Sequence, residues 1–228
     1  QFSASALRDA TEYDALDFAT AEALPDDLVG IIVDHREIWL FGERSIEVWY
    51  NSGAEFPFDR NPAGLIERGC LARDSISKTD NGVFWLADDK MVYRAFGYQP
   101  QRISTHAVES FIDGVARPED AKGWTYSQEG HTFYGLTFNE GTFVYDAATQ
   151  RWHERQSGAL NHWRVAHTVR CFNKIYGGDI EDGRIYELDL ATYTDNGTAI
   201  KRVADSPPVH ADRVRFTNPW FELEAEMG

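Results

Sequence analysis

A pair of short β-strand candidates around a tight polar turn recurs four times along this chain, about every 45 residues. The pairs open at Ile38, Val83, Thr132 and Lys174, at intervals of 45, 49 and 42 residues. Each pair is rich in β-branched and aromatic residues and is flanked by turn formers. Repeats of this length are typical of propeller blades, so we expect small sheets arranged radially.

Further strand candidates complete each repeat. An apolar stretch precedes most pairs, at residues 28–33, 69–77, 121–126 and 163–169, and outer strands such as residues 150–155 follow. About four strands per repeat result, which is the number that a blade needs. The sequence therefore predicts an all-β, β-propeller-like fold with about four to five four-stranded blades, the fifth beginning at Val214, Arg215 and Phe216.

One segment departs from the β pattern. Its apolar residues follow the i, i+3, i+4, i+7 spacing of a helix and are Val108, Phe111, Ile112 and Val115. Ser104 and Thr105 precede them as helix-starting residues, so we expect one short amphipathic helix that ends near Gly114. No linker divides the chain, which favours a single propeller domain, or a portion of one, over residues 1–228. The chain starts without Met and its last residues, 213–228, have the pattern of a strand without a terminal cap, so we expect a piece of a longer protein.

Charge and hydropathy exclude several classes of function. Lys and Arg number 22 against 37 Asp and Glu, and the resulting net charge of −15 repels the phosphate backbone of nucleic acids. We expect no general or sequence-specific nucleic-acid binding. The chain has no apolar run of 18 residues and no signal-like start, so we expect no membrane association. Cys70 and Cys171 have no Cys-x-x-Cys partner, and we expect both to be buried free thiols in a reducing cytoplasm.

The neighbouring His153 and Glu154 are the first candidates for acid–base chemistry or metal binding. Neighbours in a strand point to opposite faces, which favours a structural role for both residues. The sequence has no helical His-Glu-x-x-His motif. Ser104 and His106 lie close in sequence, but neither a nucleophile elbow nor a Gly-rich oxyanion loop surrounds them.

The carboxylates do not single out a catalytic pair. A propeller glycosidase would need two that converge across a cleft, and 37 acidic residues offer many pairs without distinguishing one. Four aspartates lie at predicted turns or strand ends, where backbone capping is the favoured interpretation: Asp88, Asp89, Asp146 and Asp189. Residues 179–183 resemble a calcium loop, but position 12 counted from Asp179 is Leu190 instead of Glu, which favours a solvated hairpin turn.

The remaining motifs also have structural interpretations. Asn196-Gly197-Thr198 matches a glycosylation acceptor by letters, yet Asp195-Asn196-Gly197 is typical of a turn. Walker and Gly-x-Gly-x-x-Gly motifs are absent from the sequence. The residues therefore indicate a scaffold, with no catalytic, cofactor-binding or metal-binding residue and no cofactor.

Ordered blocks of this sequence resemble a known family. They comprise residues 37–42, 45–49, 101–109, 130–134, 145–146, 152–155, 183–189 and 193–197. In this order they are similar to the packaged-DNA stabilisation proteins, also called tail hub or tail accessory factors, of short-tailed Salmonella-type phages. The resemblance covers nearly the whole chain, from Phe2 to about Arg202, and members of the family are longer than this chain.

The resemblance implies a structural virion protein and no enzyme. Its members assemble in the bacterial host cytoplasm as a homo-hexamer below the portal and an adaptor ring, and become part of the virion tail. There they close the DNA channel, stabilise the packaged DNA and link the head to the tail needle and tailspikes. The alternatives are a propeller glycan hydrolase, favoured by the abundance of carboxylates, and a glycan-binding module without turnover.

Overall fold

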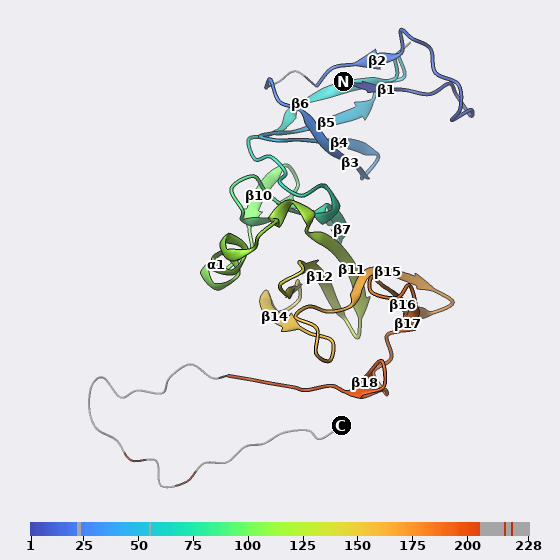
Figure 1. The fold of residues 1–228 in the computed structure, drawn as a ribbon. Helices are drawn as coiled ribbons and strands as arrows, with labels where there is room; N and C mark the ends of the chain where they lie inside the picture. Colours follow the sequence, from blue (N-terminus) through green and yellow to red (C-terminus); the bar gives the residue numbers. More distant parts are fainter. Residues whose placement is uncertain (22–23, 55, 206–216, 218–219, 221–228) are drawn as a thin grey trace. The chain divides into compact units, whose positions relative to one another are not determined.

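The computed structural model describes residues 1–21, 24–54, 56–205, 217 and 220, and its contacts define two compact units. The first is Gln1–Leu188 and the second is Asp189–Gly228. Figure 1 shows that the described residues form mostly β-strands, with one α-helix.

The first unit contains four antiparallel sheets of three or four strands, in which the strands follow one another in chain order (Figure 1). The first sheet consists of β3 (Leu28–Asp34), β4 (Glu37–Gly42), β5 (Ile46–Asn51) and β6 (Phe58–Ile66). The second consists of β7 (Ser77–Thr79), β8 (Gly82–Leu86), β9 (Val92–Phe96) and β10 (Gln99–Arg102). The third consists of β11 (Lys122–Gln128), β12 (His131–Thr137), β13 (Thr142–Asp146) and β14 (Arg151–Arg155). The fourth consists of β15 (Val165–Cys171), β16 (Lys174–Asp179) and β17 (Ile185–Glu187).

These sheets confirm the predicted propeller-like fold, with two differences in detail. The fourth sheet has three strands among the described residues, and the predicted start of a fifth blade at Val214, Arg215 and Phe216 lies outside them. The strand expected at residues 69–77 begins only at Ser77, and residues Arg73–Ser75 form a 3-10 turn instead. The hydroxyl of Ser75 donates to the Ala72 carbonyl at 2.6 Å and accepts from the Leu86 N–H at 2.9 Å, so a local side-chain bond replaces strand pairing there.

The first strands of successive sheets lie next to one another. Lys78 Nζ donates to the Val33 carbonyl at 2.6 Å, and Thr168 Oγ1 donates to the Thr125 carbonyl at the same distance. Thr125 Oγ1 in turn donates to the Lys78 carbonyl at 3.4 Å. Bonds from each first strand to the preceding one are expected of the inner strands of a propeller, where the blades approach most closely.

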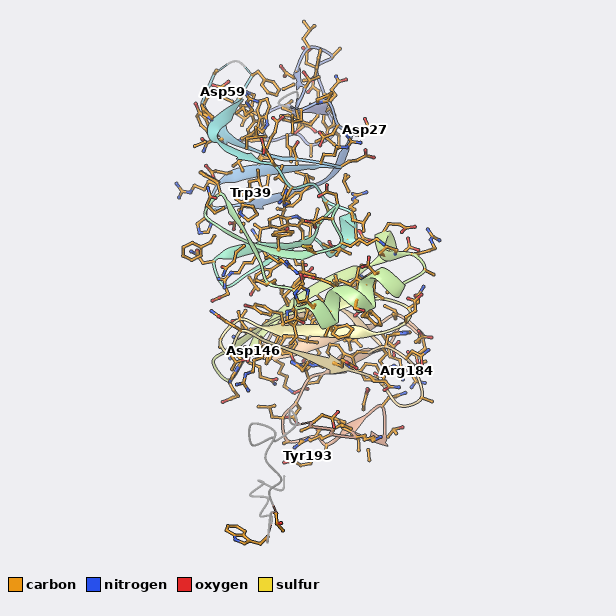
Figure 2. All side chains as sticks on the ribbon, turned by 90° about the vertical axis from the view of Figure 1, so that its left-hand side faces the viewer. Asp27, Trp39, Asp59, Asp146, Arg184 and Tyr193 are labelled. Carbon is orange, nitrogen blue, oxygen red and sulfur yellow. The ribbon has the colours of Figure 1, made fainter. Side chains whose placement is uncertain are left out.

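Side chains fill the space between successive sheets of the first unit (Figure 2), and the buried clusters there combine aromatic with aliphatic residues. A close ring pair marks each interface: Phe41–Trp85 with centroids 5.8 Å apart, Phe84–Tyr134 at 5.0 Å, and Trp124–Trp163 at 4.7 Å. Offset and edge-on ring pairs add about 0.5–1.5 kcal/mol each beyond the apolar area that they bury. The cores of the first unit therefore lie between sheets.

The predicted helix is present as α1 (His106–Gly114), between the second and third sheets in the chain. Thr105 is its N-cap, and its side chain accepts a hydrogen bond from the Val108 N–H. Val108 and Ile112 are buried, as the helical spacing predicted. A second 3-10 turn, Pro118–Asp120, leads from the helix to β11.

A small N-terminal sheet, β1 (Phe2–Ser3) and β2 (Phe18–Ala19), covers part of the first sheet. The ring of Phe2 packs edge-on against Trp49 with centroids 5.1 Å apart. This small sheet was not predicted, because a strand of two residues is too short to show an alternation of apolar and polar residues.

The second unit contains one short hairpin, β18 (Thr194–Asp195) and β19 (Thr198–Ala199). Its turn residues, Asn196 and Gly197, have φ values of +49° and +82°. This geometry confirms the predicted turn, because Asn-Gly is the preferred pair for two left-handed residues.

Gly135 on β12 provides a test of the packing of the Trp124 ring, which lies over Gly135 within the third sheet and contacts Trp163 on its other side. A Cβ atom at this position would lie 2.0 Å from Cζ2 of Trp124, so we expect Gly135→Ala to lower the free energy of unfolding by about 1–3 kcal/mol. In the matched control Gly178→Ala, on β16, the nearest atom is the His167 carbonyl oxygen at 3.9 Å, and the change should stay within about 0.5 kcal/mol. Urea unfolding of both variants measures the difference, and equal losses would contradict this packing.

Tyr134 tests the interface between the second and third sheets. Its ring is fully buried and its hydroxyl donates to the Ser75 carbonyl at 2.9 Å. We expect Tyr134→Phe to lower the free energy of unfolding by about 1–2 kcal/mol, because the buried carbonyl loses its donor. Tyr50, which is 41% exposed, serves as the control, and Tyr50→Phe should leave the urea midpoint unchanged. A midpoint for Tyr134→Phe equal to that of the wild type would show that the bond contributes nothing.

Candidate functional site

His153 and Glu154 lie on opposite faces of β14, as predicted. His153 pairs with Val144 and Glu154 with Phe143, so the two side chains diverge. Partial desolvation of the imidazole, followed by repulsion from the neighbouring Arg155, lowers the pKa of His153 to about 4. His153 is therefore neutral at pH 7, and its Nε2 accepts a hydrogen bond from Arg155 Nε at 3.2 Å.

Arg155 lies against an aromatic cage between the third and fourth sheets. Its guanidinium carbon lies 5.0–5.8 Å from the centroids of four rings, those of Trp124, Tyr126, Phe133 and Trp163. Cation–π contacts of this kind are worth about 0.5–2 kcal/mol each, depending on desolvation. The stretch that sequence analysis singled out for catalysis thus contributes to the packing of two sheets.

The four aspartates at turns all accept backbone hydrogen bonds, and for Asp89, Asp146 and Asp189 the donor lies two residues on, which confirms the capping interpretation for these three. Asp88 accepts from the Gly69 N–H, and Asp89 from the Met91 N–H. Asp146 accepts from Ala148, and, in the second unit, Asp189 accepts from Ala191. All four distances lie between 2.9 and 3.1 Å.

Asp146 has the fullest set of partners. Its Oδ2 lies 2.7 Å from both Nδ1 of His131 and the donating hydroxyl of Thr149. Burial opposes ionisation, but the hydrogen bonds from Thr149, His131 and the Ala148 amide together lower the pKa of Asp146. The carboxylate is thus charged at pH 7, closes the β13–β14 turn and also bonds to His131 at the start of β12.

Residues 179–183 form a hairpin turn, as predicted, and their first carboxylate is already bonded. Asp179 accepts the Glu181 N–H at 2.6 Å and an N–H of Arg164 at 2.5 Å. No group of three or more His, Cys, Asp or Glu side chains within the described ranges is arranged to hold a metal ion.

Ser104 and His106 do not form a nucleophile and base. Ser104 Oγ donates to Glu109 Oε1 at 2.7 Å and accepts the Val92 N–H at 3.1 Å, which ties the start of α1 to β9. The side chain of His106 is 95% exposed.

Both cysteines are free, as predicted, but only Cys70 is buried. Burial raises the pKa of Cys70 to about 12, so its thiol is protonated and unreactive at pH 7. Cys171 is half-buried, which corrects the expectation of two buried thiols: it ends β15, next to the exposed turn residue Phe172.

A cleft of about 250 Å³ between the first and second sheets is the site that sequence analysis missed. Its polar wall comes from the β3–β4 and β7–β8 turns. His35 bridges them, with Nδ1 2.7 Å from Asp34 Oδ2 and Nε2 2.6 Å from Asn81 Oδ1. The hydrogen bond to Asp34, then the one to Asn81, raises the pKa of His35.

Aromatic rings form the other wall of the cleft. Trp39 and Tyr98 line it, with centroids 6.1 Å apart, and the Tyr98 hydroxyl donates to Glu37 Oε1 at 2.6 Å. Trp39 is 3% exposed, and its Nε1 has no hydrogen-bond partner within the described part of the chain. An unpaired buried donor lowers the stability of a fold by about 1–3 kcal/mol. The Trp39 Nε1–H group is such a donor.

No helix in the described part of the chain is long and apolar enough to span a bilayer.

Several solved structures are similar to this chain. The computationally designed Ika4 protein is 14% identical over 74% of this chain and 94% of its own, with a TM-score of 0.41. The designed Ika8 protein is 13% identical over 71% of this chain and 45% of its own, with a TM-score of 0.39. PorZ, a surface component of the type-IX secretion system of Porphyromonas gingivalis, is 12% identical over 81% of this chain, with a TM-score of 0.41. The present chain spans 22% of the PorZ chain.

Curated proteins include no match to this chain. A sequence model of a phage-stabilisation family, described as the bacteriophage P22 Gp10 β-propeller, matches residues 1–193 of the 228. The four successive sheets lie within the matched residues. The chain therefore belongs to the P22 Gp10 β-propeller family of phage proteins that stabilise packaged DNA.

Proposed function

We propose that this chain is the propeller part of a tail hub that plugs the portal channel of a short-tailed phage. The family match over residues 1–193 carries the proposal. In this role the protein is a component of the virion tail, assembles as a homo-hexamer in the bacterial host cytoplasm, and contacts the adaptor ring, tail needle and tailspikes. It acts as a structural protein and not as an enzyme.

The packing between sheets supports a role in which the protein resists mechanical force. A plug has to transmit force without opening, and protein interiors packed to crystal density deform little. Each of three successive interfaces contains a close aromatic pair, and bonds from each first strand to the preceding one connect the sheets. A chain of face-packed sheets can therefore pass a load from one blade to the next.

The negative net charge favours a protein that retains DNA by closing the channel over one that binds the DNA directly. A net charge of −15 disfavours the counterion release that drives proteins onto phosphates. Retention then depends on protein–protein interfaces around the channel, and partner contacts matter more than contacts with DNA.

Deletion of the full-length gene from the phage or prophage tests the plug. We expect heads that package DNA and then lose it, so that DNA content per capsid falls to a small fraction of wild type. Complementation with the wild-type gene should restore the content. Full, tailed particles that retain DNA without the protein would contradict the proposal.

Duplex binding by the purified chain tests the mode of retention. We expect no change in the fluorescence anisotropy of a labelled 25-base-pair duplex at low salt, where attraction to phosphate would be strongest (Debye length about 30 Å at 0.01 M). Tight, salt-sensitive binding would show that the protein grips DNA, even if the deletion phenotype holds.

A further inference from the structure

His162 lies in the connection between the third and fourth sheets, after β14 and before β15. Its Nδ1 lies 3.2 Å from the backbone carbonyl oxygen of Asn139, in the turn between β12 and β13. Its Nε2 lies 3.1 Å from Oε1 of Glu181, in the turn between β16 and β17. The imidazole therefore bridges a turn of the third sheet and a turn of the fourth. The side chain of His162 is only 11% exposed, so little water can replace a partner that is lost.

Both atoms that face the imidazole nitrogens are hydrogen-bond acceptors. Neither a backbone carbonyl nor an ionised carboxylate can donate. A neutral imidazole has one N–H group, so it donates to one of these acceptors and turns a lone pair towards the other. An imidazolium has two N–H groups and donates to both. Only the charged form of His162 therefore completes the bridge.

The other charged side chains around the bridge have partners of their own. They belong to the two bridged turns, to the start of the fourth repeat and to the end of β14. Asp179 and Asp182 pair with Arg164, Glu140 accepts a backbone N–H at 3.2 Å, and Arg155 lies in its aromatic cage. The charged group paired with the imidazole is Glu181, so its carboxylate and the second ring proton decide whether the bridge is complete.

The rest of this connection is held by bonds that do not involve the imidazole. The Trp163 N–H donates to Thr142 Oγ1 at 2.9 Å, and the Ser157 N–H donates to the His162 carbonyl at 3.1 Å. Loss of the ring proton therefore releases one contact between the two turns and leaves the connection attached.

Histidine is the side chain whose charge ordinarily changes between about pH 5 and 8. We propose that His162 is a pH-dependent bridge that holds the third and fourth sheets together more tightly at mildly acidic than at alkaline pH. This property does not depend on the proposed plug function. The sign follows from the partners: the charged ring makes both bonds, so part of the stability that the bridge contributes is lost as the pH rises.

Urea unfolding of the full chain at about pH 5.5 and about pH 8 tests the proposal, because His162→Gln removes the titratable ring. We expect the variant to raise the unfolding equilibrium constant about fivefold more at the lower pH, since a hydrogen bond from a charged donor is the stronger one. The matched control is His106→Gln, whose side chain is 95% exposed. It should have the same effect at both pH values.

Glu181→Gln provides a second variant that keeps the bridge. The new amide can donate as well as accept, so a neutral imidazole can bond to both turns. We therefore expect His162→Gln, made in the Glu181→Gln background, to lower the stability equally at both pH values. Long-range proton–nitrogen NMR spectra of the wild type should show protons on both ring nitrogens of His162 at the lower pH.

Three outcomes would overturn the proposal. The first is a neutral His162 ring at the lower pH, and the second is an effect of His162→Gln that is equal at the two pH values. The third is an effect of His162→Gln in the Glu181→Gln background that still depends on pH.

Discussion

Face-to-face packing of small sheets is the constraint on which the rest of this structure depends. A sheet of three or four short strands cannot bury an apolar face by itself, so each must pack against its neighbours. The buried rings divide accordingly: Phe41 and Trp85 meet between the first two sheets, Phe84 and Tyr134 between the next two. Loss of one interface would expose the faces of two sheets at once.

The close approach of the sheets also dictates where small residues and polar anchors occur. Gly135 leaves space for the Trp124 ring, and the Tyr134 hydroxyl reaches the backbone of the preceding sheet at Ser75. Arg155 is accommodated between two sheets because four aromatic rings and the neutral His153 surround its charge. Polar groups thus contribute to the same interfaces as the apolar residues.

Local patterns predicted much of this fold, since each blade is built from contacts close in sequence. The alternating pairs identified the strands around the buried rings, the spacing from Val108 to Val115 identified α1, and aspartates such as Asp146 were correctly interpreted as turn caps. The geometry of the first hairpin turn was not predicted in the first and fourth sheets, because His35 and Phe172 are unusual at positive φ.

The cleft could not be predicted for a different reason. His35 and Asn81 lie 46 residues apart, and only the packing of two sheets brings them to 2.6 Å. The Arg155 cage likewise draws rings from β11, β12 and the start of the fourth repeat. Sites formed between repeats are invisible to analysis of a single repeat, however clear the periodicity.

Native-state hydrogen exchange, read strand by strand, tests most directly whether the four sheets behave as one body. If the aromatic interfaces couple them, the amides of β4, β8, β12 and β16 should exchange through one shared opening and respond together to added urea. Four separate opening free energies, with each sheet responding to urea by itself, would contradict the account.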